Sequence, residues 1–162
     1  MKKTIISLLI AVTLLFTGCT WFAKGEDKTF EKAGMSITLT DYFREESMSG
    51  FTVCYGSEDV AVLCLKEQFS DNPGHEDLTL DEYMELVREV NKSLSPSEIT
   101  KVDGLTSITY TASGKETYDY FTVAYKAPDG FWLVQFCALT QNYDTLYPDF
   151  VKWAKSVRFD QE

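Results

Sequence analysis

The sequence contains one histidine and none of the short motifs that mark common catalytic sites. His75 is the only imidazole in 162 residues, so a nucleophile that needs a histidine base has a single candidate partner. The chain has no P-loop, no G-x-G-x-x-G turn, no nucleophile elbow and no C-x-x-C pair. We therefore expect a protein that is not an enzyme and that uses no cofactor.

Basic residues are scarce relative to acidic ones. The chain has 15 lysines and arginines against 25 aspartates and glutamates, which gives a formal net charge of −10. A body with this charge is repelled by nucleic acid phosphates and by anionic lipid headgroups. We expect no nucleic-acid partner, and we expect the carboxylates mainly to keep the domain soluble. Attraction of a basic partner is the alternative.

The sequence also lacks an apolar run long enough to span a bilayer. Residues 5–16 form its longest such run, after Lys2 and Lys3, and a transmembrane helix needs roughly 20 residues. A positive start, a short apolar middle and small residues before a cleavage point are typical of a secretory signal peptide. The pattern therefore predicts export of the chain from the cytoplasm.

The LFTGC stretch at residues 15–19 resembles the lipobox of bacterial lipoproteins. In that family a peptidase cuts between the residues that correspond to Gly18 and Cys19, and the cysteine sulfur then carries a diacylglycerol. The resemblance implies that fatty acyl chains such as palmitate anchor Cys19 to the cell membrane, facing outside the cytoplasm. Two or more acyl chains hold a protein stably, whereas one does not. An ordinary secreted protein with an incidental cysteine is the alternative.

The chain is thus predicted to have three segments. Residues 1–18 are the lipoprotein signal peptide, residues 19–28 the lipidated N-terminus and a tether, and residues 29–162 a single globular domain. The chain from Cys19 onward has 144 residues, which suits one domain with a substantial core. We expect a monomer.

Three cysteines remain after lipidation, namely Cys54, Cys64 and Cys137. All three lie in apolar, strand-like runs, where a free cysteine behaves as a small buried hydrophobic residue. One disulfide among them would leave a thiol over, so we favour three unpaired thiols. If Cys54 and Cys64 lie on neighbouring strands of a hairpin, its short turn places them on opposite faces.

Alternating apolar residues and turn signals dominate the chain and predict mostly strands. Residues 30–39 predict two short strands around Ala33 and Gly34, and the GSED turn predicts a hairpin. The run FWLVQFCAL is apolar on nearly both faces, so it predicts a central strand that is covered above and below. The further strands are expected at residues 51–55, 60–66, 98–102, 105–111, 117–126 and 131–139.

Two helices are predicted between and after these strands. Residues 79–94 have apolar side chains at helical spacing, and Thr79 with Glu82 forms a capping box at the start. Pro96 is expected to end this helix. In YPDFVKWAKSVRF, residues 147–159, Pro148 fits the first turn of a second helix, and residues 157–159 predict a final edge strand.

The order of these elements predicts an α+β fold, a mostly antiparallel sheet with two main helices packed on it. With its landmarks GMSITLTDYF, LTLDEYMELV and YPDFVKWAKSVRF, residues 30–159 resemble the PsbP-like fold. That fold is shared by the photosystem II extrinsic subunit P, a Ran-binding import factor and many small bacterial lipoproteins. The resemblance implies an α/β/α sandwich and a non-enzymatic domain that binds or helps assemble other proteins.

Tyr118 and Tyr120 are the candidate binding surface. They share one face of a strand, and a two-residue Ser113-Gly114 turn would place Thr109 opposite Tyr118 and Ser107 opposite Tyr120. Tyrosine offers a large contact area and a hydroxyl group, so it is favoured at interfaces. An envelope protein or a ligand is the expected partner. The alternative is that a helix covers this face and the hydroxyls find buried partners.

Two weaker hypotheses concern acidic residues. Asp71, His75 and Asp77 precede the first helix and offer oxygen and nitrogen atoms to a cation such as Ca²⁺, but the loop lacks the D-x-[DN]-x-[DN]-G pattern. We therefore expect a solvated loop and no metal site. Paired carboxylates such as Glu45-Glu46 or Glu58-Asp59 raise the alternative of a small envelope hydrolase, since glycosidases use two facing acids. We expect these pairs to be solvated.

Overall fold

A computed structural model of the chain describes residues 25–160. Within them, ten strands form two antiparallel sheets, a seven-stranded sheet in the order β3-β4-β5-β9-β8-β7-β6 and a three-stranded sheet in the order β1-β2-β10. The strands are β1 (Asp27–Lys32), β2 (Met35–Thr40), β3 (Arg44–Glu46), β4 (Val53–Gly56), β5 (Val60–Gln68), β6 (Thr100–Val102), β7 (Leu105–Ser113), β8 (Thr117–Ala127), β9 (Gly130–Leu139) and β10 (Arg158–Phe159), and the two α-helices are α1 (Leu80–Val90) and α2 (Thr140–Ser156). In this part of the chain neither helix is long and apolar enough to cross a membrane.

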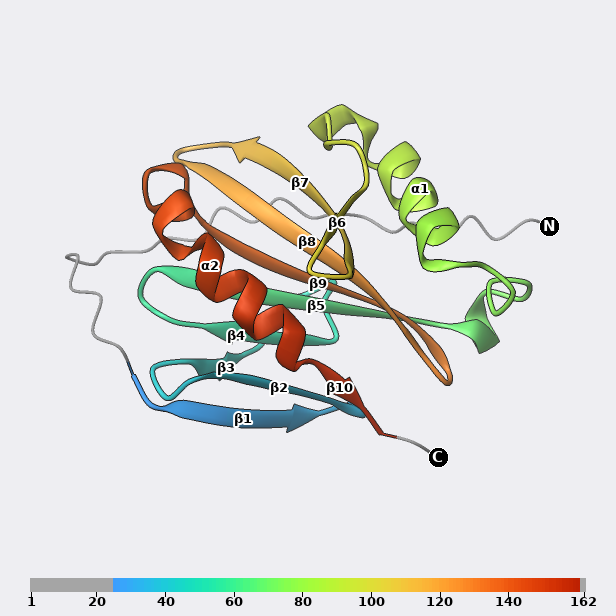
Figure 1. Cartoon of the computed structure of the whole chain (residues 1–162), viewed down its shortest axis with the longest axis horizontal. Coiled ribbons are helices and arrows are strands. Elements are labelled where there is room, and N and C mark those ends of the chain that lie inside the picture. Colours follow the sequence, from blue (N-terminus) through green and yellow to red (C-terminus); the bar gives the residue numbers. More distant parts are fainter. Residues whose placement is uncertain (1–24, 161–162) are drawn as a thin grey trace.

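The large sheet carries a hydrophobic core on each of its faces. One core contains Phe121 and Phe136 from the sheet together with Phe150 and Trp153 from α2, and the small sheet adds Ile37 on the same side. The other core contains residues from α1. Figure 1 shows α2 crossing in front of the seven-stranded sheet, with β1 and β2 beside it. The α+β class and the sandwich of two helices around a sheet are confirmed.

Strand β9 is the central strand, as its apolar sequence predicts. It pairs with β5 on one side and β8 on the other, and every residue from Gly130 to Ala138 is buried. Alternate side chains enter the two cores, so that Phe136 lies on the α2 side and Leu133 on the α1 side. A strand that is covered on both faces needs apolar residues at both of its alternating sets of positions.

Local turn chemistry fixes the first hairpin. Ala33 and Gly34 both have positive φ, 56° and 82°, as the two central residues of a type I′ turn require. The turn joins β1 to β2 with Lys32 opposite Met35, as predicted. Strand β3 was not predicted, and β1 begins at Asp27, inside the segment that we assigned to the tether.

Helix α1 has the predicted start and an earlier end. The Thr79 hydroxyl oxygen accepts a hydrogen bond from the Glu82 backbone N–H, and the Glu82 carboxylate accepts one from the Thr79 N–H. The α-helix ends at Val90 rather than at residue 94 because Asn91 interrupts it. The Asn91 side-chain amide donates to the Val87 carbonyl at 2.7 Å, and a 3₁₀ turn (Lys92–Leu94) follows.

The predicted position of Pro148 in the first turn of helix α2 is wrong. The helix begins at Thr140, so Pro148 lies inside it rather than in its first turn. An internal proline removes one hydrogen bond and costs about 3 kcal/mol. Leu146, Phe150 and Trp153 pack against the sheet from the same helix, and such burial supplies most of the stability of a helix in a protein.

The three cysteines of the domain are unpaired and buried, as predicted. Cys54 lies opposite Leu63 and Cys64 opposite Val53 in the β4–β5 hairpin, so their side chains enter different cores. Burial raises the pKa of the Cys54 thiol to about 11 and that of the Cys137 thiol to about 12. Both thiols therefore remain protonated at neutral pH and are poor nucleophiles.

Candidate functional site

A cleft of about 680 Å³ lies where the two sheets and α2 meet at one end of the domain. The start of β1, the connection between β2 and β3, the β4–β5 turn and one face of α2 all contribute to it. Its volume lies within the range of about 300–1,000 Å³ that is typical of small-molecule sites. The lining residues are Gly25, Asp27, Thr40, Tyr42, Phe43, Ser57, Glu58, Asp59, Val60, Leu146, Asp149, Lys152 and Trp153.

The floor of the cleft is apolar. Phe43, Val60, Leu146 and Trp153 line it and belong to the core on the α2 side of the large sheet. The Phe43 and Trp153 rings meet edge to face, with 5.2 Å between their centroids. Tyr42 also lines the cleft and is 50% exposed, which is unusual for a large aromatic residue in this domain. The site thus offers rings and aliphatic groups to an entering ligand.

The rim of the cleft is acidic. Its four carboxylates come from Asp27, Glu58, Asp59 and Asp149, against one cation, Lys152. The Lys152 ammonium is 2.9 Å from the nearer Asp27 carboxylate oxygen, so these two charges neutralise each other. Among the described residues no ion pair includes Glu58, Asp59 or Asp149. The rim therefore has three uncompensated negative charges.

Asp59 is an acid of the rim with a perturbed pKa. Burial raises the pKa of its carboxyl group, and the adjacent Glu58 charge raises it further. The residue is half-buried and lies in the β4–β5 turn, where the Ser57 hydroxyl donates to the Val60 carbonyl at 3.3 Å. A titratable group with a raised pKa in a cleft is a candidate functional residue.

Close packing of Gly25 shapes the mouth of the cleft. A Cβ atom at this position would lie 2.4 Å from the Asp41 carboxylate and 2.7 Å from the Tyr42 ring, so only glycine fits without a shift of its neighbours. The Glu26 backbone N–H also donates to the Asp41 carboxylate at 3.1 Å. The chain therefore enters the domain tightly against the residues that precede β3.

Tyr118 and Tyr120 do not form an exposed surface, which corrects our prediction. Their side chains are 2% and 0% exposed and lie in the core that contains Tyr83 and Met84 of α1. The Tyr118 hydroxyl donates to the Glu116 carboxylate at 2.8 Å, and the Tyr120 ring stacks on Tyr110. Both tyrosines therefore lie in the buried core to which α1 contributes, in agreement with the alternative that this face is covered.

The error arose from the position and the length of the β7–β8 connection. Residues 114–116 form it, since Ser113 pairs with Thr117, and Tyr118 lies opposite Ala112 instead of Thr109. The predicted partner was thus wrong by three positions. An odd shift in register moves a side chain to the other face of the strand pair.

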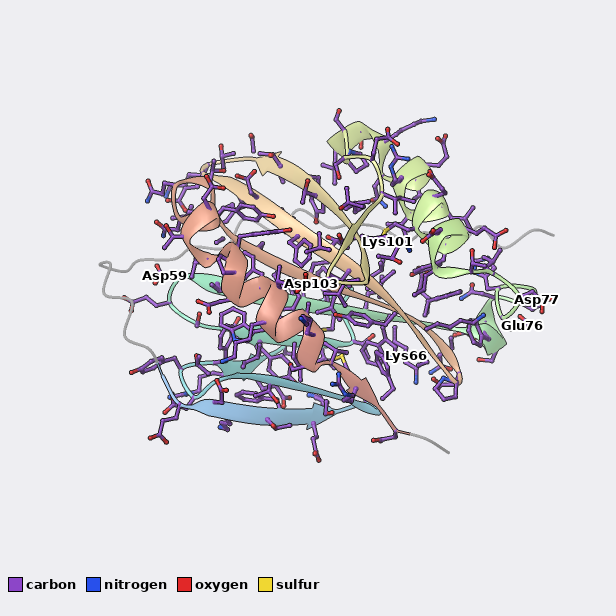
Figure 2. The ribbon with its side chains drawn as sticks, viewed as in Figure 1. Asp59, Lys66, Glu76, Asp77, Lys101 and Asp103 are labelled. Carbon is purple, nitrogen blue, oxygen red and sulfur yellow. The ribbon has the colours of Figure 1, made fainter. Side chains whose placement is uncertain are left out.

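Asp71, His75 and Asp77 lie in the loop before α1 and do not converge. Within residues 25–160, no group of three or more histidine, cysteine, aspartate or glutamate residues could hold a metal ion. The loop is instead held by Lys126, whose ammonium donates to the Glu76 and Leu78 carbonyls at 2.6 and 2.9 Å. Figure 2 shows Glu76 and Asp77 at one end of the molecule and Asp59 at the other.

Two further sets of residues were considered in the sequence analysis, the lipidation site and the acid pair in the β4–β5 turn. Gly18 and Cys19 lie outside the described residues, so lipidation stays a prediction. Glu58 and Asp59, which we expected to be solvated, line the cleft. The sequence analysis did not identify Asp149 and Trp153 as site residues. The available signal for Asp149 was an acidic residue near the start of a predicted amphipathic helix.

No protein-family model and no curated protein matches the chain. The solution structure of PsbP from the cyanobacterium Synechocystis sp. PCC 6803 is similar to it, with a TM-score of 0.58 and 12% identity over 89% of this chain and 98% of that chain. The fold is PsbP-like. At this identity the similarity concerns the fold, and it agrees with the α+β architecture of two helices on antiparallel sheets.

Two other solved structures align with the PsbP-like domain at lower scores. LpqN of Mycobacterium tuberculosis, a protein involved in cell envelope biogenesis, has a TM-score of 0.47 and 10% identity over 84% of this chain and 91% of that chain. Protein PA94 of Pseudomonas aeruginosa has a TM-score of 0.45 and 7% identity over 85% of this chain and 100% of that chain.

Proposed function

We propose that the chain is a lipid-anchored, non-enzymatic binding module on the outer side of the cell membrane, and that its ligand occupies the cleft lined by Asp59 and Trp153. The observation that carries the proposal is the combination of an apolar floor and uncompensated charge in one cavity. Ligand sites in proteins are typically apolar clefts with a few polar groups that fix orientation.

The position of the cleft supports a role near the membrane. Gly25 lines the cleft, and it lies six positions after the predicted anchor at Cys19. A chain of this length spans at most about 20 Å when fully extended. The cleft would therefore remain close to the bilayer, where it could receive a ligand from, or present one to, an envelope protein.

The charges of β1 support a monomeric module. This strand forms one edge of the small sheet, and an unpaired edge can pair with a second copy. If the β1 strands of two copies pair antiparallel about a two-fold axis at Thr29, Asp27 of each copy lies opposite Glu31 of the other. If the axis lies at Phe30, Lys28 lies opposite Lys32. Because like charges directly opposite each other are destabilising, β1 resists self-association.

A small hydrolase is the second candidate function, and Asp59 is the observation that favours it. A carboxyl group with a raised pKa can act as a general acid, and Glu58 lies next to it in the same turn. The two functions differ in the fate of the ligand. A binding module retains it unchanged, whereas a hydrolase releases a cleaved product.

Native mass spectrometry of the full protein, extracted gently from its own cells, tests the proposal. We expect a bound molecule with one constant mass, and we expect Asp149→Trp to lose it because the indole fills the cleft mouth. Asp144→Trp is the matched control, since Asp144 is exposed on the same helix and does not line the cleft. Equal retention by both variants would count against the cleft as the site, and a cleaved ligand would favour the hydrolase.

A further inference from the structure

The charges and rings of the cleft narrow the chemistry of its ligand. Glu58, Asp59 and Asp149 lack a cationic partner among the described residues, whereas Asp27 is paired with Lys152. A phosphate or carboxylate group entering the cleft would meet three negative charges, so an anionic ligand is disfavoured. A positively charged group would meet three carboxylates whose negative charge it can neutralise.

The aromatic groups favour the same sign of charge. Tyr42 lines the cleft and is 50% exposed, and the negative face of an aromatic ring attracts an ammonium group. Phe43 and Trp153 also line the cleft but are only 1% and 5% exposed. Rings combined with carboxylates can bind a cation whose remaining surface is apolar. A strongly hydrated cation without an apolar body would leave the floor formed by Val60 and Leu146 unfilled.

The size of the cleft favours a small molecule over a protein segment. Its volume of about 680 Å³ lies in the middle of the range for small-molecule sites. We propose that the cleft binds a small organic cation, an amine or quaternary ammonium group carried on an apolar body. The inference rests on the proposed function, because it names the ligand class of the same cleft.

The raised pKa of Asp59 supports this assignment. Burial and the Glu58 charge both disfavour its ionised form in the empty cleft. A bound ammonium group offsets both effects. It therefore stabilises the ionised form of this half-buried carboxylate more than it would stabilise a fully solvated carboxylate.

Calorimetry with three probes of similar shape tests the inference on the full protein in detergent. The probes are 2-phenylethylamine, the neutral 2-phenylethanol and the anionic 3-phenylpropanoate. We expect the amine to bind about tenfold more tightly than the alcohol and the anion to give no heat. The ammonium ion, which carries a positive charge but has no apolar body, should not compete with the amine.

Variants locate the charges responsible. The triple variant Glu58→Gln, Asp59→Asn, Asp149→Asn should bind the amine no better than the alcohol. The control variant Asp71→Asn, Asp77→Asn, Asp144→Asn removes the same charge from exposed positions outside the cleft and should keep the preference. Circular dichroism verifies that both variants are folded.

The outcomes separate the inference from the proposed function. If the alcohol or the anion binds as tightly as the amine, if the ammonium ion displaces the amine, or if the amine gives no heat at millimolar concentration, the organic-cation inference is wrong. An alcohol or anion whose binding is abolished by Asp149→Trp would leave the cleft as the ligand site. Retention of the natural ligand by Asp149→Trp would instead refute the proposed function.

Discussion

Replacing Phe136 with alanine is expected to lower the free energy of unfolding by about 3–5 kcal/mol. Phe136 is 0% exposed and lies on β9, the central strand of the large sheet. Its ring centroid is 5.7 Å from that of Phe150 and 6.4 Å from that of Trp153, both on α2. The truncation leaves a cavity beneath this helix, and close-packed neighbours can fill it only in part.

Urea denaturation of the wild type and the variant, followed by far-ultraviolet circular dichroism, measures this loss. Both proteins should carry Cys19→Ser so that they can be compared without detergent. Leu86→Ala is the control, because Leu86 is 44% exposed on α1 and surface substitutions usually change stability by less than about 0.5 kcal/mol. A loss below about 1 kcal/mol in Phe136→Ala would mean that α2 does not pack on β9 as described.

Replacing Cys19 with serine is expected to release the protein from the membrane entirely. A serine oxygen cannot take the place of the thioether sulfur, so no diacylglycerol is attached. Without acyl chains, the acidic domain is repelled by anionic headgroups. The measurement is incorporation of radiolabelled palmitate, together with fractionation of washed membranes.

A buried cysteine provides the control for this experiment. Cys54→Ala removes a thiol that lies inside the folded domain, so palmitate labelling and membrane association should be unchanged. If the Cys19→Ser protein stays with membranes after an alkaline wash, or if the native protein takes up no palmitate, the predicted anchor is wrong.

Elements with local signals were predictable from the sequence. The β1–β2 turn, the capping box of Thr79 and the doubly apolar β9 each depend on residues that are neighbours in the chain. Periodicity and turn chemistry act over the same short range. The opposite placement of Cys54 and Cys64 also followed from hairpin geometry.

Features that depend on longer-range packing were predicted less well. Nothing in the residues around Ser113 distinguishes a two-residue connection at residues 113–114 from a three-residue connection at residues 114–116. That choice decided which β7 residues share a face with Tyr118 and Tyr120. The burial of Leu146 and Phe150 on the sheet extends α2 upstream through Pro148. Such tertiary contacts routinely outweigh local propensity.

The cleft could not be predicted because its walls are distant in the sequence. Asp59 and Trp153 are brought together only when α2 packs beside the β4–β5 turn. The sequence did show an adjacent acid pair, Glu58 and Asp59, and a helix with an aromatic face. Without the fold, both are equally consistent with a solvated turn and an ordinary core helix.

Photo-crosslinking in intact cells tests most directly whether the cleft is the ligand site of this domain. The crosslinking amino acid p-benzoylphenylalanine replaces Tyr42, which is half exposed at the cleft, or Leu86, which is similarly exposed on α1. We predict a discrete adduct of constant mass at position 42 and none at position 86. The same adducts at both positions, or none at position 42, would contradict the account.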